Sequence, residues 1–106
     1  MKTFDVKTED RDGAVHVSLS GELDISSAAK VEDVLARVEP QRPDQIVLDL
    51  SGLDFMDSTG LRLLIAADAR ARDEGRRLTI VKGPEPVQRV FRITRLEERL
   101  EIVDSA

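Results

Sequence analysis

The sequence predicts a single α/β domain, with a mixed sheet of four or five strands packed by three to four helices. Three observations support this fold class. The chain starts with the pattern of an antiparallel hairpin, short apolar runs typical of strands then alternate with helical patterns, and 106 residues suffice for one core. No linker, internal repeat or low-complexity segment interrupts the chain, so we expect one domain over residues 1–106.

The composition is that of a folded, acidic protein. Hydrophobic residues make up 41% and charged residues 35%, which excludes a disordered chain. A net charge of −5 and the absence of Trp and Tyr disfavour binding to nucleic acid or to an anionic membrane. Without cysteine there is no disulfide, thiolate nucleophile or cysteine metal site. The sequence shows no leader-like or membrane-spanning apolar run, so we expect a cytoplasmic protein.

The N-terminal hairpin is predicted over residues 3–20. Phe4 and Val6 share one face of its first strand, and residues 9–13 form the turn, which ends in the strong hairpin signal Asp12-Gly13. Apolar and polar residues alternate strictly over residues 14–20, so one face of this strand should pack on the core.

Residues 21–24, Gly-Glu-Leu-Asp, are expected to break this strand and to lead into the first helix. Asp24 or Ser26 can cap that helix by accepting a backbone N–H. Pro40 and Pro43 should stop it, because the residue before a proline avoids the helical region. The predicted buried stripe consists of Ala28, Val31, Val34, Leu35 and Val38.

The centre of the chain predicts a strand, a tight loop and a second helix. Residues 46–50 are a short apolar run of the kind found in buried parallel strands. The helix should begin at or beside Ser58, since Asp57, Ser58 and Thr59 are all capping residue types, and it should end near Gly75. Its expected core stripe consists of Leu61, Leu64, Ile65 and Ala69.

Three further apolar residues of this helix lie off that stripe, namely Leu63, Ala66 and Ala67. Either the sheet lies close to them, which favours small residues, or they form an exposed partner surface beside Ser58. The first interpretation is favoured because scattered apolar residues are normal on protein surfaces.

The last part of the chain predicts a strand, a helix and a short final element. Residues 78–81 form a second β-type run, and Gly83-Pro84 opens a third helix. The side chains of Val87, Val90 and Phe91 should face inward. Residues 94–98 have no clear pattern, and residues 100–103 suit a final edge strand better than the tail of a short helix.

The sequence contains no recognisable set of catalytic residues. His16 alternates outward with no nucleophile near it, and the glycine-rich phosphate loops and the His-Glu-x-x-His motif are absent. Asp49, Asp54 and Asp57 gather near the end of the central strand and could hold Mg²⁺, but roles in a turn and a helix cap are favoured. A receiver domain is disfavoured, because that fold needs an acidic pair after its first strand and the residues after Phe4-Asp5-Val6 offer no well-placed pair. We therefore expect no enzyme, no metal and no cofactor.

Ser58 is the candidate functional residue. It would stand at the positive end of a helix dipole and at the carboxyl end of the central strand, where a phosphate is well accommodated. The alternative is that Ser58 only caps the helix, since serine is a common N-cap residue. Nothing nearby in the sequence could deprotonate Ser58, so another protein would have to supply the catalysis.

Residues 55–61, Phe-Met-Asp-Ser-Thr-Gly-Leu, together with residues 21–24, resemble the STAS domain of bacterial anti-sigma-factor antagonists. The resemblance covers essentially the whole chain and implies a STAS-like mixed sheet of four or five strands. It implies that Ser58 is the phosphoacceptor, with Thr59 less favoured. The implied partner is a GHKL-type protein that is both anti-sigma factor and serine kinase, and a serine phosphatase would reverse the modification.

The same resemblance implies a contact surface made of Asp24, Asp57, Ser58, Thr59 and Gly60. The unphosphorylated protein would bind the anti-sigma factor and free the sigma factor, and phosphorylation would end that binding. Two alternatives stay open. One is a STAS subunit of a lipid-transport or stress-signalling assembly that docks a partner without phosphorylation. The other is an enzyme or a sensor that binds a nucleotide, for which no motif gives support.

Overall fold

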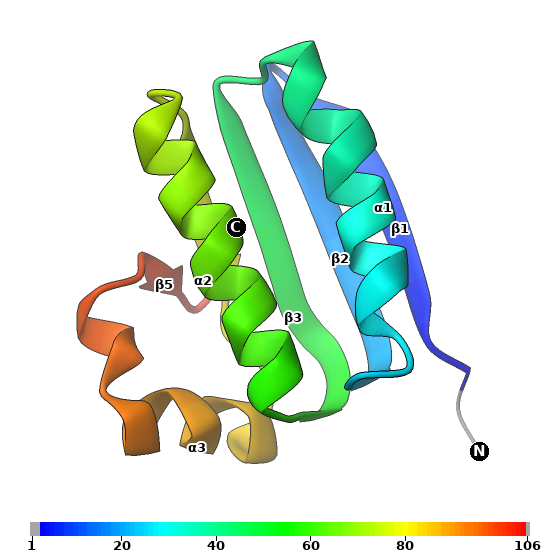
Figure 1. The fold of residues 1–106 in the computed structure, drawn as a ribbon, viewed down its shortest axis with the longest axis vertical. Coiled ribbons are helices and arrows are strands. Elements are labelled where there is room, and N and C mark those ends of the chain that lie inside the picture. The colour runs from blue at the N-terminus through cyan, green and yellow to red at the C-terminus, as the bar shows by residue number, and fades with distance from the viewer. Residues whose placement is uncertain (1–2, 106) are drawn as a thin grey trace.

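The computed structural model describes residues 3–105 as one sheet with helices packed on it (Figure 1). The five strands follow each other in the order β1-β2-β3-β4-β5. The elements are β1 (Asp5–Arg11), β2 (Ala14–Leu23), α1 (Ala28–Val38), the 3₁₀ helix η1 (Glu39–Gln41), β3 (Gln45–Met56), α2 (Ser58–Asp73), β4 (Arg77–Val81), α3 (Glu85–Thr94), the 3₁₀ helix η2 (Leu96–Glu98) and β5 (Ile102–Val103).

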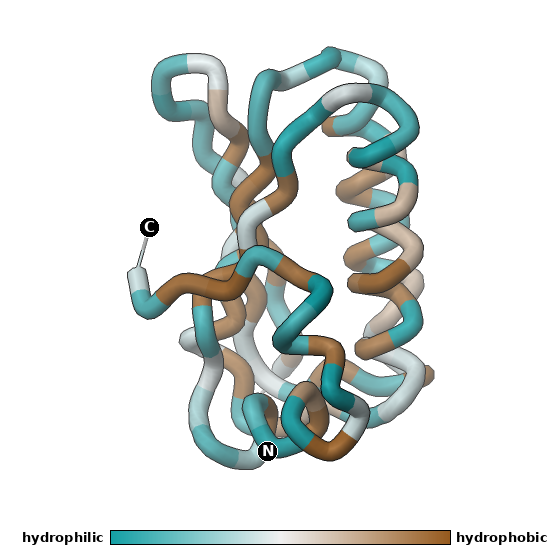
Figure 2. The backbone as a smooth tube through the Cα atoms, turned by 90° about the vertical axis from the view of Figure 1, so that its left-hand side faces the viewer, coloured by the Kyte–Doolittle hydropathy of each residue, from teal (hydrophilic) through white to brown (hydrophobic). Residues whose placement is uncertain are grey.

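The sheet is mixed, which confirms the predicted fold class. β1 and β2 form the antiparallel hairpin, whereas β2, β3, β4 and β5 pair in parallel. Figure 2 shows that the long helices lie on one side of the sheet. α3 lies at the end of the sheet where α2 begins, and it contacts β3 and α2 (Figure 1).

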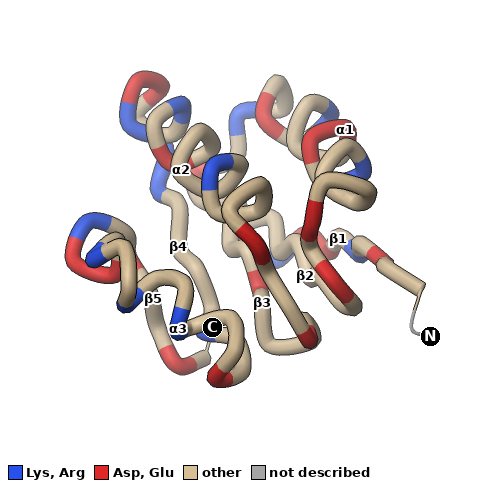
Figure 3. The backbone as a smooth tube through the Cα atoms, turned by 60° about the horizontal axis from the view of Figure 1, so that its bottom comes forward, with Lys and Arg blue, Asp and Glu red and all other residues tan. Residues whose placement is uncertain are grey.

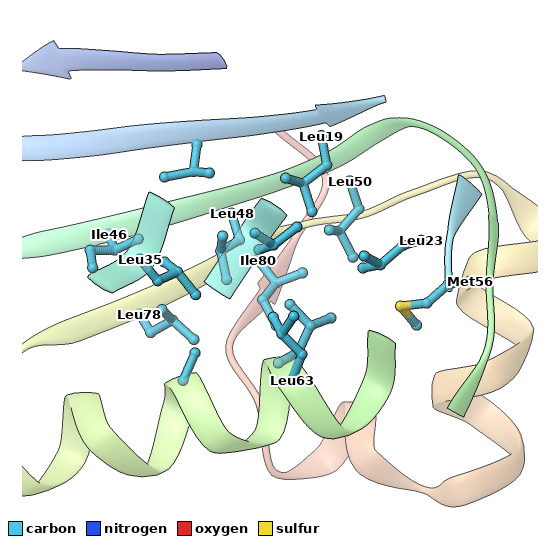
Figure 4. Close-up of a cluster of buried hydrophobic side chains, with 14 of the residues drawn as sticks. Leu19, Leu23, Leu35, Ile46, Leu48, Leu50, Met56, Leu63, Leu78 and Ile80 are labelled. Carbon is cyan, nitrogen blue, oxygen red and sulfur yellow. The ribbon is translucent and has the colours of Figure 1, made fainter. Parts of the chain in front are cut away.

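The hydrophobic core fills the space between the sheet and the pair α1 and α2 (Figure 4). Ile46, Leu48 and Leu50 of β3 alternate toward the helices and are fully buried. Leu35 of α1 and Leu63 of α2 approach the same cluster from the helical layer (Figure 4). Each such side chain contributes about 1.5–3 kcal/mol through removal from water, so this shared core fixes the helices on the sheet.

β2 does not break at Gly21, so the predicted strand end there is wrong. The strand continues to Leu23, with register shifts between Ser18 and Ser20 and between Gly21 and Glu22. Gly21 has a φ of +96°, and a Cβ atom at this position would lie 3.0 Å from the Cα of Phe4. Gly21 therefore permits an irregularity within β2. The sequence pattern alone suggested that the strand ends at this residue.

β3 is also longer than predicted, because it extends past residue 50 to Met56. Ser18 pairs with Asp49 and Ser20 with Gly52, so two residues of β3 oppose one residue of β2. This bulge places Leu50 and Leu53 on the same buried face although they are three residues apart. The bulge disrupts the period of two, which is why residues 51–56 resembled a loop in the sequence.

The buried face of α2 differs from the predicted stripe. Leu61 and Leu64 are buried as expected, but Ile65 is 38% exposed and Ala69 is exposed. The residues that face the sheet are Gly60, Leu61, Leu63, Leu64, Ala67 and Ala71. The interpretation that small residues lie close to the sheet is therefore confirmed for Ala67, whereas Ala66 is exposed.

The predicted turn over residues 9–13 is too long, because β1 runs to Arg11 and only Asp12 and Gly13 separate it from β2. The other predicted elements are confirmed, with one more correction at the start of α1. Its predicted stripe is entirely buried, it ends before Pro40, and β4, α3 and the final strand β5 lie where expected. Neither Asp24 nor Ser26 caps α1 with its side chain, because the N-cap residue is Ser27 and it makes no side-chain cap bond. The Asp24 carbonyl instead accepts from the N–H groups of Ser27 and Ala28, at 3.2 and 2.9 Å.

Gly21 gives a direct test of the strand irregularity. Gly21→Ala should reduce the free energy of unfolding by about 2–4 kcal/mol, because it combines a left-handed backbone with a clash. Gly75→Ala is the matched control, since Gly75 has a φ of +70° but nothing within 4 Å of its missing Cβ. Its loss should be about 1–2 kcal/mol. Urea unfolding of both variants measures the difference, and equal losses would contradict the steric explanation.

Candidate partner-binding site

The candidate site lies at the edge of the sheet where the parallel strands β2 and β3 end. Leu23 and Met56, the last residues of the two strands, are register partners. The Asp57 N–H donates to the Leu23 carbonyl at 3.2 Å, which ties the two strand ends together. Asp24 and Asp57 therefore follow neighbouring strands at the same edge. The family resemblance implied that Asp24 and Ser58 share one surface, and this strand pairing brings both residues to the same edge.

Asp57 is the residue that caps α2. Its backbone is extended, and its carboxylate accepts from the N–H groups of Thr59 at 2.9 Å and Gly60 at 3.3 Å. The sequence offered three adjacent capping residue types, and the structure assigns the role to the first of them. The alternative of Ser58 as the helix cap is therefore wrong.

Ser58 is the first residue of α2, and its side chain is exposed. Within residues 3–105 its hydroxyl forms no hydrogen bond, so it is available to an incoming group. Thr59 is half-buried and lines a groove of about 560 Å³ between α1 and α2. The Ser58 side chain is therefore more accessible than that of Thr59. The N-terminus of α2 also offers positive potential to a phosphate at Ser58.

Gly60 is buried, and its missing Cβ faces the ends of the two strands. A Cβ atom there would lie 2.7 Å from the Cγ of Met56 and 2.8 Å from the Cγ of Leu23. Glycine thus lets the first turn of α2 pack directly on the strand ends. The expected contribution of Gly60 to a contact surface is indirect, because Gly60 positions the helix that carries Ser58.

The Asp24 side chain is engaged within the loop that joins β2 to α1. Its Oδ1 accepts from the Ser26 N–H at 2.9 Å and from the Ser26 hydroxyl at 2.6 Å. The Ser27 hydroxyl donates to the Glu22 carbonyl at 2.7 Å and accepts from the Asp24 N–H at 3.0 Å. The hydrogen bond from the Ser26 hydroxyl is the main cause that lowers the pKa of Asp24. These bonds hold the loop in one conformation.

Two exposed apolar side chains at this edge were not singled out from the sequence. Ile25 is 81% exposed and Phe55 is 43% exposed, and they lie next to Asp24 and Asp54 in the chain. Ile25 precedes Ala28 by three residues, a spacing that would place it on the buried stripe of a helix. Its exposure follows from the hydrogen-bonded turn over residues 24–27, and the sequence period gives no signal for it.

Charged residues of both signs occur around this edge. Residues 20–29 and 51–61 hold Glu22, Asp24, Asp54 and Asp57, and Lys30 and Arg62 follow directly after the two segments. Arg62 lines the same groove as Thr59. Figure 3 shows acidic positions where β2 and β3 end.

The structure gives no support to a metal site. Within residues 3–105, no group of three or more histidine, cysteine, aspartate or glutamate side chains could hold a metal ion. Asp49, Asp54 and Asp57 therefore do not form such a group. In the same part of the chain, no helix is long and apolar enough to cross a membrane.

Comparison with known families identifies the fold. The family model described as "Mlab, STAS domain" matches residues 6–104. The chain therefore belongs to the STAS domain family, as the resemblance of residues 21–24 and 55–61 implied.

Several relatives are named as regulators of sigma factors. The anti-sigma-F factor antagonist RsfB of Mycobacterium tuberculosis is 34% identical over 65 residues, which cover 61% of this chain and 53% of RsfB. The chain thus spans about half the length of that relative. The anti-sigma-B factor antagonist of Staphylococcus aureus is 26% identical over 99 residues, which cover 93% of this chain and 92% of that protein.

Solved structures agree with this fold. An anti-sigma factor antagonist from Mycobacterium paratuberculosis superposes with a TM-score of 0.86 and 27% identity, over 97% of this chain and 87% of that one. The anti-sigma factor antagonist SpoIIAA in its unphosphorylated form gives a TM-score of 0.76 at 22% identity, over 95% and 88% of the chains. The latter match shows a shared fold.

The assignment of Asp57 rather than Ser58 as the helix cap can be tested by measuring the free energy of unfolding of variants. Asp57→Ala should lower the free energy of unfolding by about 0.5–2 kcal/mol, because the N–H groups of Thr59 and Gly60 lose their acceptor. Ser58→Ala should change it by less than about 0.5 kcal/mol, as expected for an exposed side chain. Asp57→Ser should recover most of the loss. A larger loss for Ser58→Ala than for Asp57→Ala, in urea unfolding, would contradict this assignment.

Proposed function

We propose that this chain is an anti-sigma-factor antagonist and that the edge surface around Ser58 binds an anti-sigma factor. The observation that carries the proposal is the exposed Ser58 hydroxyl at the start of α2, which forms no hydrogen bond within residues 3–105 and lies next to the cap formed by Asp57. Because Asp57 closes the helix, Ser58 can be modified without loss of the cap. The names of the relatives in Mycobacterium and Staphylococcus support the same role.

In this proposal the interaction is a phosphorylation switch. The unphosphorylated chain binds a GHKL-type anti-sigma factor that is also a serine kinase, and the sigma factor is released. The kinase then transfers phosphate to Ser58, with Thr59 as the less favoured acceptor, and the complex dissociates. A serine phosphatase restores the binding form. The chain contributes no catalytic residue and works in the cytoplasm, where its partners act on transcription.

The proposed contact surface consists of Asp24, Asp57, Ser58 and Thr59, with Gly60 acting through the packing of α2. A phosphate on Ser58 adds about −1.5 to −2 charges at a helix N-terminus, where free N–H groups and the dipole accommodate it. The domain should therefore keep its fold after modification. Modification should therefore change the surface charge more than the shape, since the phosphate is added at an exposed position.

The loss of partner affinity follows from desolvation. A partner that hydrogen-bonds a neutral hydroxyl has no group arranged to pair with a phosphate, and burying an unpaired charge costs about 2–5 kcal/mol of binding. That corresponds to roughly thirty-fold to several-thousand-fold in affinity.

The test begins by identifying the kinase. Purified candidate serine-kinase anti-sigma factors from the same genome are incubated with the chain and ATP, and mass spectrometry locates the phosphate. We expect modification of wild type and of Thr59→Ala, but not of Ser58→Ala. Phosphate on Thr59 alone, or on neither residue with any candidate, would contradict the proposal and favour a STAS subunit that docks its partner unmodified.

The second step measures the switch by calorimetric titration of the kinase without ATP. Phosphorylated protein should bind at least about thirty-fold more weakly than unmodified protein. Ser58→Ala should bind in all conditions, and Ser58→Asp should weaken binding in part because it carries one charge. Affinities of the two wild-type forms within a factor of two would show that phosphorylation is not the switch.

A further inference from the structure

We propose that Arg62 is the partner, within this chain, of a phosphate on Ser58, and that the two groups form an ion pair on the surface of α2 when Ser58 is modified. The proposal rests on the proposed function and adds the group that holds the phosphate. It gives a positioning role to Arg62, a residue that neither the capping pattern nor the family resemblance singled out.

The spacing of the two residues on one helix is the first argument. Ser58 is the first residue of α2, and Arg62 follows it four positions later, so the two lie one turn apart on the same side of the helix. Long side chains on a helix extend back over the preceding turn, which here carries Ser58. An acidic group four residues before a basic group is also the more favourable order for such a pair. Arg62 can therefore reach a phosphate on Ser58.

The free guanidinium group of Arg62 is the second argument. α2 carries three arginines, and two of them are already paired. Arg70 contacts Glu39 at 2.8 Å. Arg72 contacts Asp68 at 3.0 Å. Arg62 is exposed, and within residues 3–105 its side chain forms no hydrogen bond or ion pair. The unpaired arginine of this helix is thus the one beside the candidate phosphoacceptor.

The neighbouring carboxylates leave Arg62 available, which is the third argument. The Asp57 carboxylate accepts N–H groups in the first turn of α2, and the Asp24 carboxylate is bonded within its own loop. Glu32 of α1 lines the same groove as Arg62, but the two form no ion pair in the described part of the chain. A phosphate carries about −1.5 to −2 charges, more than any of these carboxylates. It would therefore be the strongest acceptor within reach of Arg62.

Such an ion pair links the modification to the loss of the partner. In the free chain the guanidinium group neutralises part of the phosphate charge, so the domain accommodates the phosphate. A partner that fits the neutral Ser58 hydroxyl has to separate the phosphate from Arg62 before it can dock, and this separation lowers the affinity further. Removal of Arg62 should therefore reduce the factor by which phosphorylation weakens binding.

The test uses the full chain with phosphoserine encoded at position 58, so that no kinase is required. A pH titration followed by phosphorus NMR measures the second pKa of the phosphate, which a paired cation lowers. The phosphate should bind its last proton about two- to five-fold more tightly in Arg62→Gln than in the chain with Arg62, because the ion pair stabilises the dianion. Arg62→Lys keeps the charge without the planar fork and should fall between the two.

Lys30→Gln is the matched control for this titration. Lys30 is exposed in the first turn of α1, directly after the loop that carries Asp24, and its substitution removes the same charge from the same chain. The pKa of the phosphate should stay unchanged in this variant. Equal pKa values with and without Arg62 would overturn the proposal. An effect of Lys30→Gln as large as that of Arg62→Gln would also overturn it, because the general charge of the chain would then explain the result.

The contribution of the ion pair to the switch is measured by calorimetric titration with the anti-sigma factor that phosphorylates Ser58, without ATP. The ratio of the dissociation constants of the phosphorylated and unmodified chains should be about two- to five-fold smaller in Arg62→Gln than in wild type. The same ratio should be unchanged in Lys30→Gln. An unchanged ratio in Arg62→Gln would overturn the role of the pair in the switch.

The two levels of proposal fail differently. A chain that no candidate kinase phosphorylates and no candidate anti-sigma factor binds contradicts the proposed function. The phosphorus NMR titration needs neither partner, so it supports or overturns the pairing of Arg62 with phosphorylated Ser58 in either case.

Discussion

The parallel pairing of β2 with β3, closed by the bond from the Asp57 N–H to the Leu23 carbonyl, is the constraint on which the site depends. It brings residues 24–27 and 57–60 to one edge although 29 residues separate the two segments in the sequence. Gly60 adds a second condition, because only a residue without a Cβ lets α2 start in contact with Leu23 and Met56. A change in this packing would move the Ser58 hydroxyl relative to the loop that carries Ile25.

The first residues of α2 separate the structural roles of Asp57 and Gly60 from the functional role proposed for Ser58. Asp57 turns its carboxylate back onto the helix N–H groups, Ser58 projects outward, and Gly60 faces the core. This division lets a chemical change at Ser58 act on the surface while the cap and the packing stay in place. A switch that releases a partner without remodelling the domain needs this separation.

The sequence was sufficient to predict the order of the elements, the mixed sheet and the position of Ser58, because turn residues and hydrophobic periods mark them locally. It was insufficient where tertiary contacts decide. The bulge at residues 50–51 and the passage of β2 through Gly21 depend on the pairing of two strands. The rotation of α2, which buries Ala67 and exposes Ile65, depends on the surface it packs against. The exposure of Ile25 depends on side-chain bonds within a turn.

The central claim is that the edge formed by residues 24–27 and 57–61 is the partner-binding surface. Mapping of backbone amide NMR shifts, during titration of the labelled chain with the anti-sigma factor, tests it most directly. The account predicts that the largest changes fall in these two segments and that phosphorylation of Ser58 abolishes them at the same partner concentration. Large changes confined to the open face of the sheet or to α3, with residues 24–27 and 57–61 unaffected, would contradict it.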